Sequence, residues 1–105
     1  MTTFEVISMV CDDQLSEVSF KGQILNGGKE GKGICEYEEG IQYEGEFHSN
    51  TRHGLGSLFV NDQMLYHGFW REGLMEGKGV LHMLEGEIES YEGNFREGKI
   101  EGYGY

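Results

Sequence analysis

Apolar and polar residues alternate with a period of two along most of this chain. Residues 43–47 read Tyr-x-Gly-x-Phe, so one face of an extended strand carries a ring, a glycine and a second ring. Residues 54–60 read Gly-x-Gly-x-Leu-x-Val, which places two glycines and two aliphatic side chains on one face. This alternation is typical of β-strands that bury one face. No helical periodicity follows residue 20, so the pattern predicts an all-β fold.

The alternating segments recur as a tandem repeat. The units begin at Phe20, Tyr43, Tyr66 and Tyr91, with spacings of 23, 23 and 25 residues. Counting the first residue of each unit as zero, positions +2, +11 and +13 are glycine in all four units. These glycines are Gly22, Gly31, Gly33, Gly45, Gly54, Gly56, Gly68, Gly77, Gly79, Gly93, Gly102 and Gly104. Such regularity indicates a repeat protein, with an N-terminal segment, 1–19, and repeats 20–42, 43–65, 66–90 and 91–105.

A turn separates the two strands of each unit. Position +7 is occupied by Gly27, Asn50, Gly73 and Gly98. Glycine and asparagine are the residues that most readily adopt a positive φ, so each unit is predicted to be a β-hairpin with its turn within positions +6 to +10. Further turns join successive hairpins around Gly40, Asn61-Asp62 and Gly86. We expect the glycines to leave space for the large rings of neighbouring strands, because stacking must supply the stability that one hairpin lacks.

Tyr-x-Gly-x-Phe/Trp, followed by Gly-x-Gly nine residues after the first glycine, resembles the MORN repeat. The resemblance covers residues 20–105, although the first unit has Phe20 and Ile24 in place of the tyrosine and the Phe/Trp. It implies an elongated single-layer antiparallel sheet of tandem β-hairpins, twisted with a groove on one face. Proteins of this family serve mostly as scaffolds or targeting modules. The resemblance therefore implies a non-catalytic scaffold or adaptor for protein binding, in a cytoskeletal or ciliary assembly of the cytoplasm.

The two ends of the array need separate explanations. Residues 4–11, FEVISMVC, are apolar and β-prone, and we expect a strand that caps the first repeat, with a short amphipathic helix as the alternative. The last hairpin stops at Tyr105 with a short second strand. Either the chain is a fragment of a longer array, or this end pairs with another copy, as a homodimer or by end-to-end association.

The aromatic row is the first candidate site. We expect the groove to be lined by Tyr43, Phe47, Tyr66, Trp70, Tyr91 and Phe95 and to bind a partner peptide or helix. Tyrosine and tryptophan are favoured interface anchors. The same rings could instead pack on the glycines and only hold the sheet together, and the sequence leaves both uses open.

An apolar patch on the opposite face is the second candidate site. It consists of Ile34, Phe59, Phe69 and Val80, which interrupt an otherwise polar face. Such a patch is either a second partner surface or the place where the N-terminal segment packs.

The net charge and the absence of known motifs reduce the number of possible function classes. The formal net charge is −11, which argues against nucleic acid and disfavours an anionic membrane surface, whereas it suits a protein partner with basic flanks. No nucleophile–base pair, phosphate loop or metal-binding spacing occurs, so we expect no enzyme, cofactor or metal. Cys11 and Cys35 fit no redox spacing, and the absence of a signal peptide favours the cytoplasm. The alternative function, which rests on the resemblance to MORN proteins, is a membrane- or phosphoinositide-associated targeting module, as part of a larger protein.

Overall fold

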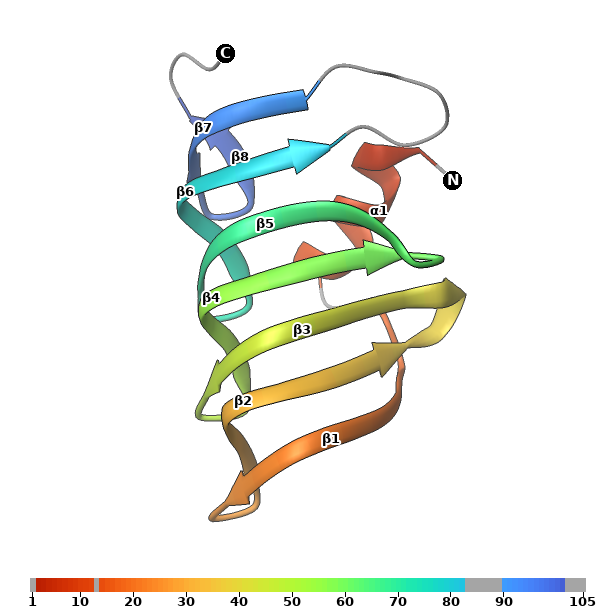
Figure 1. The fold of residues 1–105 in the computed structure, drawn as a ribbon, viewed down its shortest axis with the longest axis vertical. Coiled ribbons are helices and arrows are strands. Elements are labelled where there is room, and N and C mark those ends of the chain that lie inside the picture. The colour runs from red at the N-terminus through yellow and green to blue at the C-terminus, as the bar shows by residue number, and fades with distance from the viewer. Residues whose placement is uncertain (1, 13, 83–89, 102–105) are drawn as a thin grey trace.

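The computed structural model describes residues 2–12, 14–82 and 90–101. In this part of the chain, eight strands form one antiparallel sheet in which sequential strands are neighbours (Figure 1). The strands are β1 (Glu17–Leu25), β2 (Gly28–Tyr37), β3 (Ile41–His48), β4 (Thr51–Val60), β5 (Gln63–Arg71), β6 (Leu74–His82), β7 (Ser90–Arg96) and β8 (Lys99–Glu101). Helix α1 (Thr3–Cys11) precedes the sheet, and the 3₁₀ turn η1 (Glu38–Gly40) joins β2 to β3. The predicted all-β sheet of tandem hairpins is confirmed.

Two-residue turns close the hairpins. Their central residues are Asn26-Gly27, Ser49-Asn50, Glu72-Gly73 and Glu97-Gly98, all with positive φ. At position +7, φ is 82°, 70°, 87° and 84° in the four repeats, so the predicted left-handed position is confirmed. Two successive positive φ values are typical of a type I′ turn, whose twist matches that of the strands, and positions +8 to +10 therefore belong to the second strand. The turn around Gly86, like Gly102 and Gly104, lies outside the described residues.

The turns are also bonded to one another along the array. From the second repeat on, the N–H of the +7 residue donates to the carbonyl of the +9 residue one repeat earlier, at 2.9–3.0 Å: Asn50 to Lys29, Gly73 to Arg52 and Gly98 to Met75. The Glu30 carboxylate accepts from the N–H of Ser49 at 3.1 Å and contacts His48 at 2.9 Å. The His48 contact, followed by the Ser49 N–H, lowers the pKa of Glu30. Successive hairpins are thus held together at their tips as well as along their strands.

A column of glycines crosses the sheet, and tyrosine rings lie on it. Gly45 is opposite Gly56, and a Cβ at Gly56 would overlap the ring of Tyr43. The Tyr43 hydroxyl reaches past the glycine and donates to the carbonyl of Glu46 at 2.8 Å. Tyr66 repeats this geometry one unit later, over Gly68 and Gly79, with its hydroxyl 3.0 Å from the carbonyl of Phe69. The predicted role of the glycines as space for the rings is confirmed at positions +2 and +13. It is wrong at +11, where a Cβ on Gly31, Gly54 or Gly77 would meet Gln23, Glu46 or the Phe69 Cβ rather than a ring of the row.

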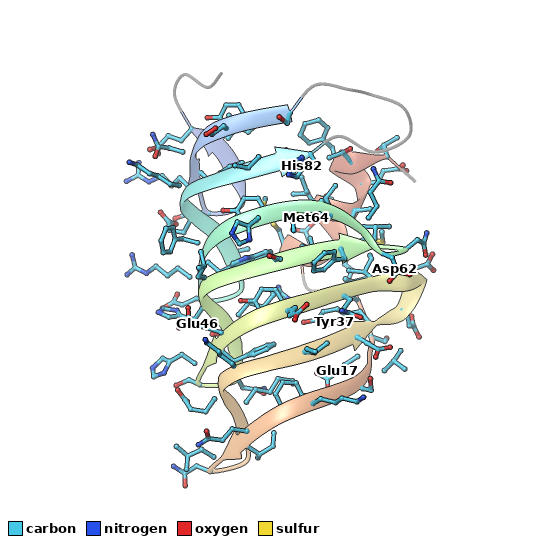
Figure 2. The ribbon with its side chains drawn as sticks, in the orientation of Figure 1. Glu17, Tyr37, Glu46, Asp62, Met64 and His82 are labelled. Atoms are coloured by element: carbon cyan, nitrogen blue, oxygen red, sulfur yellow. The ribbon has the colours of Figure 1, made fainter. Side chains whose placement is uncertain are left out.

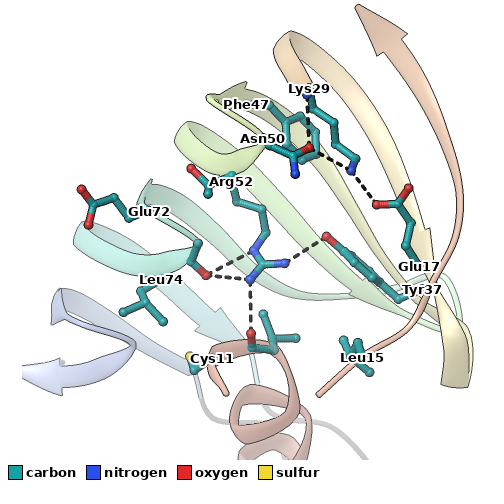
Figure 3. Close-up of a pocket in the computed structure, with 13 residues that line it drawn as sticks. Cys11, Leu15, Glu17, Lys29, Tyr37, Phe47, Asn50, Arg52, Glu72 and Leu74 are labelled. Atoms are coloured by element: carbon teal, nitrogen blue, oxygen red, sulfur yellow. Dashed lines mark hydrogen bonds and ion pairs between the residues drawn. The ribbon is translucent and has the colours of Figure 1, made fainter. Parts of the chain in front are cut away.

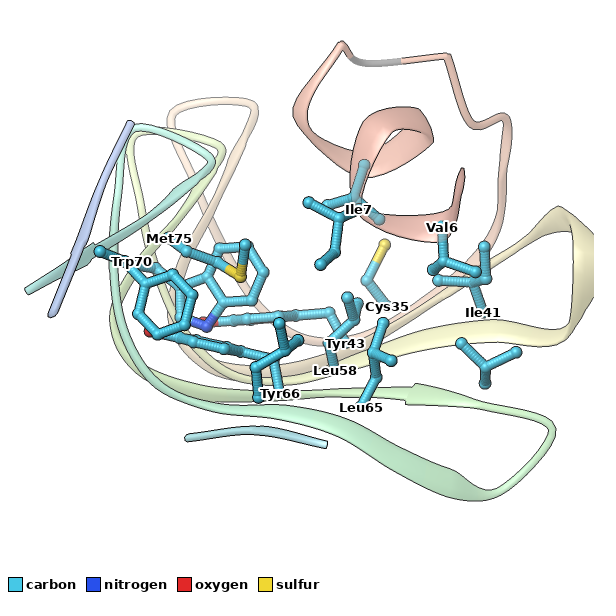
Figure 4. Packing of buried hydrophobic residues seen from close by; sticks show 14 of the residues in the cluster. Val6, Ile7, Cys35, Ile41, Tyr43, Leu58, Leu65, Tyr66, Trp70 and Met75 are labelled. Atoms are coloured by element: carbon cyan, nitrogen blue, oxygen red, sulfur yellow. The ribbon is translucent and has the colours of Figure 1, made fainter. Parts of the chain in front are cut away.

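Recurrent bulges curl the sheet. From the pair Gly45↔Gly56 to the pair Phe47↔Arg52, β3 advances by two residues while β4 advances by four. Gly54 lies in the longer stretch with φ of 75°. A bulge bends its strand and increases the local twist. Because irregularities of this kind also occur between β1 and β2 and between β5 and β6, the open sheet curls around a groove (Figure 4).

The N-terminal segment is a helix, so the expected strand over the first repeat is wrong. The Thr2 hydroxyl accepts from the N–H of Glu5 at 3.2 Å, while the Glu5 carboxylate accepts from the N–H of Thr2 at 2.7 Å. This reciprocal capping box stabilises the helix start. Val6, Ile7 and Val10 then fall on one helical face and are 0%, 8% and 2% exposed. That face packs into the concave side of the sheet, and α1 contacts β6 rather than capping β1 (Figure 1).

A methyl group added at Gly56 should destabilise the sheet, because its Cβ would overlap the Tyr43 ring. We expect Gly56→Ala to lower the free energy of unfolding by about 2–3 kcal/mol, the upper range for overpacking. Urea unfolding followed by Trp70 fluorescence measures this change. Gly28→Ala is the matched control, since its Cβ would lie 3.2 Å from Cβ of Asn50, and we expect a loss below about 1 kcal/mol. Equal losses in the two variants would contradict the ring-on-glycine mechanism.

Candidate partner-binding groove

The aromatic side chains of the concave face form one continuous row. Each ring of the row meets the next nearly at right angles, with centroids 5.0–5.3 Å apart and interplanar angles of 77–88°. The order across the sheet is Phe20, Phe47, Tyr43, Trp70, Tyr66, Phe95 and Tyr91. Edge-to-face pairs of this kind add about 0.5–1.5 kcal/mol each beyond the burial of their area. The six predicted rings are therefore brought together, joined by Phe20 of the first repeat.

Most of these rings are covered. Tyr43 and Tyr66 are 0% exposed, and Trp70, Phe95 and Phe47 are 3%, 2% and 4% exposed. Burial raises the pKa of the Tyr43 and Tyr66 hydroxyls. The Trp70 indole N–H is likewise satisfied internally, by the carbonyl of Gly56 at 3.2 Å. The ring row thus packs the sheet, and α1 lies over it (Figure 4).

One cationic side chain connects α1 to the groove. Arg52 donates from Nη2 to the carbonyls of Val10, at 3.2 Å, and Gly73, at 2.7 Å. Its Nη1 donates to the Tyr37 hydroxyl at 2.9 Å, and its guanidinium lies 5.4 Å from the centroid of the Trp70 ring (Figure 3). The guanidinium fork can satisfy several acceptors at once, which a lysine cannot do in this geometry. Neither Arg52 nor Tyr37 was predicted from the sequence as a site residue.

Position +9 of each repeat points into the groove and sets its chemistry. In the first two repeats the residue is Lys29 or Arg52, and in the last two it is Met75 or Ile100. Lys29 pairs with Glu17 at 2.6 Å, and this contact lowers the pKa of the Glu17 carboxyl. This change from basic to apolar residues at one repeat position is visible in the sequence. It could have predicted that the two ends of the groove differ in chemistry.

Helix α1 leaves a cavity on each side. The polar cavity, about 380 Å³, lies between the end of α1 and the turns of the second and third hairpins, and Lys29, Arg52 and Phe47 line it (Figure 3). The apolar slot, about 480 Å³, lies between α1 and the C-terminal hairpin. Its wall includes Phe95 from the predicted ring set. Phe4 and Ile100 also line the apolar slot and remain 57% and 41% exposed.

The patch on the opposite, convex face is partly assembled. Phe69 is 49% exposed, and it lines a shallow hollow of about 530 Å³ with Val80 and Leu55. Ile34 lines the neighbouring hollow, which Leu55 also borders. Phe59 lies apart from both hollows and is opposite Met64, which Figure 2 labels on β5. Because α1 packs on the concave side, the patch is not covered by the described N-terminal segment.

The described ranges 2–12, 14–82 and 90–101 offer little for metal binding or thiol chemistry. They contain no cluster of three or more His, Cys, Asp or Glu side chains that could hold a metal ion. Burial raises the pKa of the Cys11 and Cys35 thiols, which disfavours the reactive thiolate. Among these same residues, no helix is long and apolar enough to cross a bilayer.

Removing the Arg52 guanidinium should loosen α1, because the Val10 and Gly73 carbonyls and the Tyr37 hydroxyl would lose their donor. We expect Arg52→Gln to lower the free energy of unfolding by about 1–3 kcal/mol. Hydrogen exchange should speed up in α1 more than in β3 and β4. Arg71→Gln, at an exposed site, is the charge-matched control and should change neither quantity. Unchanged protection of α1 in Arg52→Gln would show that apolar packing alone holds the helix.

Comparisons with known proteins agree with this architecture. A family model described as MORN repeat matches residues 20–42, 43–64, 66–83 and 91–105. Alsin from Mus musculus is 31% identical over 98 residues, which are 89% of this chain and 6% of Alsin. Alsin from Homo sapiens is 30% identical over the same share of both chains.

ALS2 C-terminal-like protein from Homo sapiens is 30% identical over 98 residues, 89% of this chain and 10% of that protein. The chain thus spans a tenth or less of the length of these relatives. The four matched segments start at the predicted residues Phe20, Tyr43, Tyr66 and Tyr91. MORN repeats are in general protein- or membrane-binding modules rather than catalytic ones. From its four matched repeats and its sheet of stacked hairpins, the chain belongs to the MORN repeat family.

Proposed function

We propose that this chain is a non-catalytic protein-binding module whose groove receives an apolar segment, helix or peptide, of a partner protein. The observation that carries the proposal is that the groove already holds an amphipathic helix. Val6, Ile7 and Val10 of α1 pack on the concave face as the anchors of a helix-in-groove complex do. The curvature and the ring-lined floor therefore suit a helical ligand.

The apolar slot beside α1 supplies the room for such a segment. Its volume, about 480 Å³, lies within the range of ligand pockets, which is roughly 300–1,000 Å³. Phe4 on one wall and Ile100 on the other are exposed side chains that a partner would bury. Phe95 forms part of the floor, while Tyr43, Tyr66 and Trp70 support it from within the ring row.

Charge favours a partner with basic flanks. The chain carries −11 overall, and Asp12 and Glu97 border the apolar slot together with Lys99. Complementary charge raises association rates and excludes wrong partners more than it adds affinity. Through this groove the chain would act as a scaffold or adaptor, and we place it in a cytoskeletal or ciliary assembly by analogy with other MORN proteins. Docking on an anionic membrane is disfavoured by the same charge.

Substitution of the two exposed slot residues tests the proposal. We expect Phe4→Ser with Ile100→Ser to lose specific proteins that the wild-type chain captures from cell extract, and to bind a purified partner about tenfold more weakly. Both residues are exposed, so circular dichroism should show an unchanged fold. Phe69→Ser, an equally exposed ring on the convex face, is the matched control and should retain the partner.

The opposite outcome would move the site. Loss of the partner in Phe69→Ser alone would place binding on the convex patch. Wild-type binding to vesicles of acidic lipid, with no captured protein, would favour the membrane-targeting function instead.

A further inference from the structure

Among the described residues, no strand pairs with the outer edge of β1. β1 pairs with β2 and lies at one end of the sheet, away from α1 (Figure 1). The strand is nine residues long and contains no proline, whereas the described part of β8, at the other end, is three residues long. An unprotected edge strand presents its N–H and C=O groups to any chain that can pair with it. The β1 edge is therefore the longer docking edge in the described part of the chain.

Side chains on β1 are exposed where the equivalent interior side chains are buried. At position +4, Ile24 is 57% exposed, but Phe47, Trp70 and Phe95 are at most 4% exposed. Interior strands have a neighbour on both sides, and β1 has one. Val18 and Leu25 are also exposed, at 65% and 52%. A strand added to β1 would bury this apolar surface.

We infer that this edge binds a second copy of the chain, by antiparallel pairing of two β1 strands about Gly22. Gly22 would then face the partner's Gly22. On the concave face, Phe20 would lie opposite Ile24 of the partner subunit, twice by symmetry. On the convex face, Lys21 would lie opposite the partner's Gln23, and Ser19 opposite the partner's Leu25. Two-fold pairing of identical surfaces is the commonest form of homo-oligomer.

The register follows from the rest of the sheet. Glycine faces glycine at each junction across the column, as in Gly22↔Gly33 and Gly33↔Gly45. A dimer centred on Gly22 extends that column across the two-fold axis. Centring on Lys21 instead would place two lysines opposite each other, and like charges in that position are destabilising. The Gly22-centred register pairs apolar groups and opposes no like charges.

Sedimentation velocity of the full chain over a wide concentration range tests the association. We expect a monomer–dimer equilibrium that Ile24→Lys weakens by about tenfold, because each substitution affects two symmetry-related contacts. Ile24 is exposed, so circular dichroism should confirm an intact fold. Ile100→Lys on β8 and Phe69→Lys on the convex face introduce the same charge at other exposed apolar sites and should leave the equilibrium unchanged.

Disulfide trapping tests the register. Facing residues in an antiparallel pair have Cα atoms about 4.5–5.5 Å apart, within disulfide range. A mixture of Lys21→Cys and Gln23→Cys chains should therefore form a disulfide-linked heterodimer on mild oxidation. Each variant alone should not, and the oxidised wild type accounts for Cys11 and Cys35.

Four results would overturn the inference. A monomer at every concentration excludes the dimer. Loss of association in Ile100→Lys but not in Ile24→Lys shows tail-to-tail pairing of two β8 edges. A disulfide dimer of Lys21→Cys alone shows the Lys21-centred register, and no disulfide in the mixture excludes the Gly22-centred one.

Discussion

The contact between a tyrosine ring and a pair of facing glycines is the constraint on which this structure depends. The tyrosine ring at position zero lies flat along its own strand, over Gly+2 and the Gly+13 opposite, and its hydroxyl donates to the carbonyl of the residue at +3. Any side chain at either glycine would lift the ring. In this position the tyrosine ring has a fixed orientation, and the neighbouring rings pack against its edge and its face. The continuous edge-to-face row results from these contacts. The ring row is therefore a consequence of the glycine column.

The same geometry gives the groove its variable chemistry. Bulges at the Gly+11 positions curl the sheet, and position +9, on the longer strand of each bulge, then points to the inside. The ring-on-glycine contact does not involve the side chain at +9, so that position can change from Lys29 and Arg52 at one end to Met75 and Ile100 at the other. Helix α1 lies between these ends, bonded to the basic side through Arg52 and packed on the apolar side through Ile7.

Features that the repeat determines were predictable from the sequence, and features that depend on non-repeated contacts were not. Hairpins, left-handed +7 positions and ring-on-glycine packing each recur along the chain. Several copies therefore support the same structural prediction, although any one segment alone would be ambiguous. Residues 4–11 occur once and have both helix and strand formers; the Thr2–Glu5 capping box was the local signal for a helix. Arg52 bonds to a carbonyl 42 residues away, so its role required the position of α1. The ring row was located correctly, but its burial depends on α1 as well.

A stacked array of hairpins has no intrinsic end, because each strand can pair with a neighbour through both of its edges. A further strand can therefore always be added to the outermost one. Arrays with the same repeat are therefore distinguished by features outside the repeated pattern. Here these features are the N-terminal helix, the residues at +9 and the strand at the edge. In this chain the concave face is closed over its centre by α1 and remains accessible at the slot beside the C-terminal hairpin. The edge of β1 lies at the far end of the sheet from that slot (Figure 1). Pairing at the edge and binding in the groove use separate surfaces, so a chain could do both without one excluding the other.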